Sequence, residues 1–302
     1  MQEIVTRACI LLLVIALGYV LRRTGFLPES AFAVVSRVVL NVTLPCAVFT
    51  NFAHMEASGA LLWLFPLGFL CNVLFVSLGY LAGRRRGRQE QVFCMLNFSG
   101  YNIGCFALPY VSSLLGPTAV VSACLFDAGN AIWATGGTNA VCAALQEGGR
   151  LRLGPTLKRL ARSVTILAYL VMLLLAVLRV RLPGPVLEFA ELVGSANSFL
   201  AMLMLGLGMN LDIRREQLRW IGRAVCVRFG VSLVLSLCFF YLLPFDSEIR
   251  LGAALAAFSP VSSISPAYTR ERGGDVGLAS SWNTITILLS LLCMTLMLLF
   301  AS

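Results

Sequence analysis

The chain has 302 residues, of which 59% are hydrophobic and only 12% are charged, with a net charge of +9. An ordinary soluble domain is roughly 25% charged, so this chain has too little polar surface to cover a globule in water. The composition excludes an ordinary soluble protein and indicates that the bilayer is the solvent. No nucleic-acid partner is expected, because the basic residues lie in loops between apolar blocks.

Ten apolar blocks predict membrane-spanning helices, since roughly 20 mostly apolar residues are needed to cross the hydrocarbon. We place them at residues 4–21, 38–52, 60–81, 92–114, 118–144, 160–178, 186–209, 223–243, 251–269 and 276–300. The second block is short and is expected to extend back over residues 31–37. Several blocks lie close together, so nine and eleven spans are alternatives.

Most Lys and Arg residues fall in alternate loops, at residues 22–23, 84–88, 150–162, 214–223 and 270–272. The positive-inside rule places those loops in the cytoplasm. Both termini are then expected outside the cytoplasm, as an even number of spans requires.

The two halves of the chain have a similar pattern of apolar blocks. Pro109 falls on Pro266 and Gly116 falls on Gly273 when the first half is shifted by 157 residues. Five spans per half force the second half to enter the membrane from the opposite side, which gives an inverted repeat typical of secondary transporters. Coincidence among evenly spaced helices is the alternative. The division that follows is residues 1–145, a cytoplasmic connector at 146–159, and residues 160–302.

Two spans in corresponding positions of the halves carry helix-breaking residues. The fourth contains Gly100, Gly104 and Pro109, and the ninth contains Pro260 and Pro266 around three serines. Unpaired backbone groups persist in a membrane only where protein or a wet cavity satisfies them. Matched interruptions therefore indicate a transporter site, with ordinary proline kinks as the alternative.

The amino-terminal ends of such half-helices would suit an anion. No basic residue is expected near the centre of a span, since Arg37 and Arg228 are expected to reach the cytoplasmic interface. The candidate substrate-binding residues lie at the breaks and on the neighbouring spans: Asn102, Pro109, Asn130, Ser259, Pro260, Ser262, Ser263, Ser265, Pro266, Asn283 and Thr284.

Asp127 is an isolated charge in the fifth span. It lies about nine residues into that span, close to the bilayer midplane at about 1.5 Å per residue. Asn130 shares its helical face. We expect Asp127 to be a proton-coupling residue, with a structural carboxyl that braces the fourth span as the alternative. Its counterparts in the tenth span are the neutral Asn283 and Thr284, for which polar contact between helices is the alternative role.

No metal ion or cofactor is expected. The ten cysteines include no CxxC spacing, and most of them lie inside apolar blocks. The single histidine, His54, is expected in a loop after the second span and excludes a multi-histidine metal site. No Walker motif or catalytic constellation is present, so we do not expect an enzyme.

Several segments resemble the auxin efflux carrier family, which includes bacterial permeases for malate or malonate. They are NVTLPCAVF in the second span, SGYNIGCFALP in the fourth, LFDAGN in the fifth, LAMLMLGLGM in the seventh and GGDVGLAS after the ninth. The plant carriers place prolines at a helix crossover, and Pro109 with Pro260 or Pro266 matches that feature. The connector is short, as in bacterial members, so auxin is not expected as the substrate.

The resemblance implies an all-α polytopic membrane protein with ten transmembrane helices in two inverted five-helix repeats, in which helices 4 and 9 are broken and cross. It implies a scaffold of helices 1, 2, 6 and 7 and a mobile transport unit of helices 3–5 and 8–10. It also implies a homodimer formed through the scaffold, in a bacterial inner membrane.

The leading hypothesis is a permease that carries a small organic anion, such as a dicarboxylate, by alternating access with H⁺ or Na⁺. The first alternative is an H⁺- or Na⁺-coupled symporter or antiporter of another inverted-repeat family, with Asp127 as the ion carrier. A channel or receptor is the third.

Overall fold

The computed structural model describes the whole chain except residues 54–58, 152, 179, 181, 212–214 and 302. Every regular element in the described part is helical, which confirms the all-α class. His54 and the basic residues at 152 and 214 lie outside the described residues.

The first half of the chain forms helices that include three π-helical segments and one 3₁₀ segment. The elements are α1 (Gln2–Arg23), α2 (Ala31–Val38), η1 (Val39–Thr43), α3 (Leu44–Ala53), η2 (Gly59–Trp63), α4 (Leu64–Gly83), α5 (Arg88–Phe98), η3 (Ile103–Ala107), α6 (Leu108–Leu114), α7 (Pro117–Ile132), η4 (Trp133–Gly137) and α8 (Thr138–Glu147).

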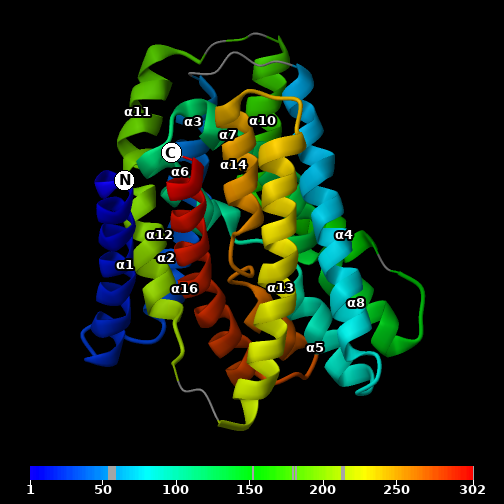
Figure 1. Ribbon diagram of the computed structural model, residues 1–302. Helices are drawn as coiled ribbons and strands as arrows, with labels where there is room; N and C mark the ends of the chain where they lie inside the picture. The colour runs from blue at the N-terminus through cyan, green and yellow to red at the C-terminus, as the bar shows by residue number, and fades with distance from the viewer. Residues whose placement is uncertain (54–58, 152, 179, 181, 212–214, 302) are drawn as a thin grey trace.

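A short helix follows in the predicted connector, and the second half is again helical. The elements are α9 (Leu153–Ala161), α10 (Val164–Leu178), α11 (Gly184–Ser195), α12 (Asn197–Gly208), α13 (Arg215–Leu242), α14 (Ser247–Ala257), α15 (Ser265–Glu271) and α16 (Val276–Ala301). The helices form one elongated bundle, in which α1 packs on α16 and the two termini lie close together (Figure 1).

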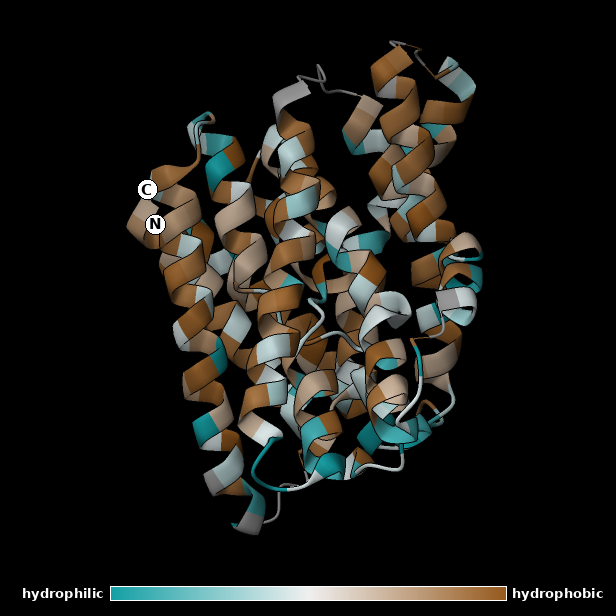
Figure 2. Ribbon diagram, turned by 90° about the vertical axis from the view of Figure 1, so that its right-hand side faces the viewer, coloured by the Kyte–Doolittle hydropathy of each residue, from teal (hydrophilic) through white to brown (hydrophobic). Residues whose placement is uncertain are grey.

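The length and the apolar surface of the helices suit a lipid bilayer. Six helical stretches of the described chain are long and apolar enough to cross a membrane: Gln2–Arg23, Ala31–Ala53, Leu61–Gly83, Gly184–Gly208, Trp220–Leu242 and Val276–Ala301. Large side chains such as Leu13, Leu192 and Leu242 are exposed, which water disfavours and hydrocarbon does not. Figure 2 shows hydrophobic residues along the helices and hydrophilic residues gathered most densely at the end away from the termini. These features confirm a polytopic membrane protein.

The two halves of the chain pack against each other reciprocally. Helix α1 packs on α12, and α10 packs on α3, so the first long helix of each half contacts the second span of the other. Glycines allow the closest approach, because a Cβ added at Gly206 would collide with the carbonyl oxygen of Ile15 and one at Gly18 with that of Leu203. Small residues at helix interfaces have this role in membranes.

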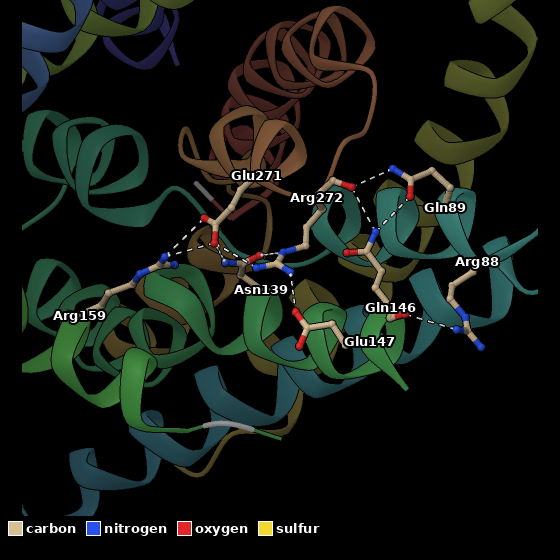
Figure 3. A network of polar contacts seen from close by, with 8 residues as sticks. All are labelled: Arg88, Gln89, Asn139, Gln146, Glu147, Arg159, Glu271 and Arg272. Carbon is tan, nitrogen blue, oxygen red and sulfur yellow. Dashed lines mark hydrogen bonds and ion pairs between the residues drawn. The ribbon is translucent and has the colours of Figure 1, made fainter. Parts of the chain in front are cut away.

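A polar network ties the connector helix to the bundle (Figure 3). Arg159 on α9 pairs with Glu271 at the end of α15, at 3.3 Å, and Asn139 on α8 donates to the same carboxylate at 3.1 Å. The side chain of Arg272 donates to the side-chain oxygen of Asn139 at 2.8 Å. Burial raises the pKa of Glu271, but the Asn139 hydrogen bond and the Arg159 charge outweigh it, so the pKa lies below its ordinary value.

Candidate functional site

Two helices are interrupted, and their breaks lie against each other. Helix α5 ends at Phe98 and the chain becomes helical again at Ile103, while α14 ends at Ala257 and α15 begins at Ser265. The N–H of Asn102 donates to the Pro260 carbonyl at 2.8 Å, and Tyr101 and Val261 form an isolated antiparallel bridge.

Glycine allows the turn at the first break. Gly100 has a φ of +73°, a conformation that L side chains rarely adopt. An added Cβ would also lie 3.2 Å from the Cβ of Ser262, whose N–H donates to the Gly100 carbonyl at 3.1 Å. The break is therefore a built backbone contact between two distant parts of the chain.

Side-chain amides from neighbouring helices satisfy the unwound backbone. The Oδ1 of Asn72 accepts from the N–H of Gly100 at 2.8 Å, and Asn130 exchanges two hydrogen bonds with the backbone of Tyr101, at 2.8 and 2.9 Å. At the other break, Asn283 donates to the Val261 carbonyl at 2.9 Å. Buried backbone groups need such partners in hydrocarbon, which explains why irregular chain is stable here.

Arg228 lies at the centre of the structure, and the expectation that it reaches the interface was wrong. Only 1% of its surface is exposed. Its guanidinium donates to the carbonyl of Phe98 and, at 3.2 Å, to that of Ser259. These carbonyls lie at the carboxyl ends of α5 and α14, where the helix dipole favours a cation.

A cavity of about 250 Å³ lies beside the paired breaks. Five predicted site residues line it: Asn102, Asp127, Asn130, Ser262 and Ser263. Its wall also includes parts of all three π-helical segments, through residues such as Leu40, Gly104 and Thr135. Single-turn π segments are frequent at functional sites.

The carboxyl of Asp127 accepts hydrogen bonds from three groups. Asn130 donates to one oxygen at 2.7 Å and the hydroxyl of Tyr169 donates to the other at 2.6 Å, while the backbone of Gly104 is the third donor. Gly104 belongs to η3, directly after the first break. Asp127 therefore connects α7 and α10 with the segment that follows the break. This contact is also the one that the alternative role, a structural carboxyl that braces the fourth span, requires.

Other predicted site residues hold the backbone or lie elsewhere. Ser259, Pro260 and Asn283 contact the break through backbone hydrogen bonds but do not line the cavity.

Four more are separate from the cavity. Pro109 is the second residue of α6 and follows the break by seven positions, and Pro266 is the second residue of α15. Ser265 donates to the Asn97 side chain at 2.8 Å, and Thr284 accepts from the N–H of Asn210 at 2.9 Å.

Sequence reasoning missed Arg228, Tyr169 and Asn72. Arg228 was misjudged because the predicted span began at residue 223, whereas α13 begins at Arg215. Tyr169 and Asn72 are polar residues in apolar helices, and that isolation was the signal that could have marked them.

Interrupted helices that meet beside a cavity within an apolar helical bundle are a feature of many secondary transporters. The family model described as a membrane transport protein matches residues 3–147. An uncharacterized transporter from Methanothermobacter thermautotrophicus is 26% identical over 292 residues, which cover 94% of each chain. These matches confirm the resemblance to a membrane transport family that was found in the sequence.

Proposed function

We propose that this protein is a secondary transporter that carries a small organic anion, such as a dicarboxylate, by alternating access at the paired breaks. The observation that carries the proposal is the cavity beside the Tyr101–Val261 bridge, with polar side chains such as Asn102, Asp127 and Ser263 in its wall. A volume of about 250 Å³ suits a molecule of a few carbon atoms rather than a drug-sized ligand, whose pockets run from about 300 Å³ upward.

The cavity offers hydrogen-bond donors to an anion. The helix Ile103–Leu114 begins at the cavity wall, and the first N–H groups of a helix have no partner within it. The hydroxyls of Ser262 and Ser263 and the amide of Asn102 add side-chain donors. Asn102 and Ser263 already bond each other at 2.7 Å across the two breaks, so a ligand that bridges them would contact both interrupted helices.

Asp127 supplies the coupling step in this proposal. Its carboxylate would repel an anion in the same cavity, so protonation favours substrate binding. Of its three donors, the Tyr169 hydroxyl can accept as well as donate through the same oxygen. Gly104 and Asn130 reach the carboxyl with N–H groups, and the side-chain oxygen of Asn130 already accepts from Asn72 and Tyr101. A proton on Asp127 therefore reverses the bond to Tyr169 and weakens the contact between α7 and α10.

We also propose that the chain is a ten-span inverted repeat with a scaffold and a transport unit. Support comes from the reciprocal packing of α1 on α12 and α10 on α3, and from breaks in corresponding spans. The contact of Asp127 with Tyr169 then joins the transport unit to the scaffold.

Two measurements test this function. In a thermal-shift screen of the purified protein, dicarboxylates should raise the melting temperature more than indole acids or Na⁺. A shift with Na⁺ alone would instead favour a cation symporter or antiporter. For a dicarboxylate that binds, reconstituted Asp127→Asn should lose uptake driven by a pH gradient but retain exchange. Gradient-driven uptake at the wild-type rate in that variant would refute the coupling role.

A further inference from the structure

A second cavity lies next to the one at the breaks. It also has a volume of about 250 Å³, and it is lined by Ala47 and Asn51 of α3, Ser112 of α6, Cys124 of α7 and Ser198 of α12, among others. Within the described chain, Leu44 is the one residue that lines both cavities.

The two cavities follow the same helices one after the other. On α7, Cys124 faces the second cavity and Asp127 faces the first, a separation of about one helical turn. On the fourth span, Leu108 and Cys105 divide in the same way. The cavities therefore lie end to end along one path, with Leu44 at their junction.

Leu44 fills the junction closely. Only 1% of its surface is exposed. A Cβ added at Gly104 would lie 2.7 Å from its Cδ2, so the glycine leaves the space that the leucine occupies. Gly104 is also the backbone donor to Asp127, which places the leucine directly beside the proposed coupling residue.

The backbone at Leu44 is suited to movement. Leu44 directly follows the π-helical segment η1 and precedes Pro45. Proline cannot donate a hydrogen bond to the preceding turn, and π segments are local departures from α-helical hydrogen bonding. This turn is held by fewer regular hydrogen bonds than an unbroken helix would be.

We propose that the side chain of Leu44 is the hydrophobic gate that separates the two cavities, and that Gly104 is its seat. The proposal builds on a transport path through the paired breaks, but it requires neither a particular substrate nor coupling through Asp127. An apolar side chain at a constriction excludes water and ions. Truncation of Leu44 should therefore join the two cavities into one continuous path that water and ions can enter.

The test uses potassium chloride as the probe, so that it does not depend on the substrate or on the sign of the charge that passes. Leu44→Ala in a planar bilayer should give an ion conductance that the wild type and Val42→Ala lack. Val42 is the matched control because it lies two residues away on the same span and is exposed.

A second measurement uses the native thiol of Cys124. A membrane-impermeant maleimide is added on the side of the membrane that holds the basic residues at 158–162. This side is chosen because Ser163, which follows them, lines the first cavity. Labelling is quantified by peptide mass spectrometry. Labelling in Leu44→Ala should be faster by roughly tenfold, which corresponds to about 1.4 kcal/mol of lost barrier. Leu44→Val, which removes one carbon, should give a smaller increase and serves where the alanine variant does not fold. A folded variant with neither conductance nor faster labelling would overturn the proposal.

Discussion

Replacement of Arg228 by methionine tests whether one buried cation holds both interrupted helices. Methionine keeps a long side chain but cannot donate to the carbonyls of Phe98 and Ser259. Two buried acceptors left without donors cost about 1–3 kcal/mol each. The guanidinium also lies 4.7 Å from the Phe75 ring centre and 5.3 Å from that of Tyr101, contacts worth about 0.5–2 kcal/mol.

An opposing effect reduces that loss. Burial of a charge carries a desolvation cost of several kcal/mol, and methionine removes it. We therefore expect Arg228→Met to destabilise the protein by about 3 kcal/mol, near the upper end for single substitutions. Transport should fall as well, because the breaks would no longer be held in register.

The assay is thermal unfolding of the purified variants in detergent, with uptake measured on the folded fraction. Arg223→Met is the matched control, since Arg223 is on the same helix and exposed. Arg228→Lys should be intermediate, because one ammonium group does not reproduce the planar fork of guanidinium. A melting temperature and uptake rate in Arg228→Met equal to those of the control would refute the assigned role.

Two further predictions concern the packing of the halves and the connector. Gly206→Ala should destabilise the protein by about 2 kcal/mol or more, because the added methyl meets the Ile15 carbonyl; Gly230→Ala, at a position with open space around it, is the control, and equal melting temperatures would contradict the close packing of α1 on α12. The lowered pKa of Glu271 means that its ion pair with Arg159 contributes stability above the ordinary carboxyl value of 4.5 and loses it as the pH falls through the folded-state pKa. Melting curves from neutral to acidic pH should show a smaller drop in Glu271→Gln than in the wild type, and parallel curves would contradict this contribution.

The apolar blocks and the breaks were predictable because both depend on local sequence. Spans of sufficient length follow from composition, and the Gly100 turn follows from a residue that adopts positive φ. Helix ends were less predictable. The charged residues at 215–223 were predicted to form a loop, but they form the first turns of α13. Long basic side chains can extend to water from a helix end, so charge there does not end the helix. Because the predicted span began too late in the chain, Arg228 was expected near the interface, whereas it lies near the middle of α13.

The candidate site, too, could be predicted from the sequence only in part. The sequence indicated which segments break and that Asp127 is an isolated acid, and the structure brings Asp127, Asn102 and Ser263 to one cavity. Pro109 attracted attention as a helix breaker, but proline is well tolerated in the first turn of a helix, where it lies in α6. A proline in the sequence therefore marks a nearby helix start as readily as the break itself.

By itself, the sequence determined the solvent, the helical class and the positions where helices are interrupted, since each depends on the polarity and backbone freedom of neighbouring residues. Tertiary structure alone decided which polar groups meet. Tyr169 reaches Asp127 across 42 residues of chain, and Arg228 reaches Phe98 across 130. The reason is physical: a buried polar group is satisfied by whichever donor or acceptor the packing of helices brings within about 3 Å, and that distance is set by the whole bundle.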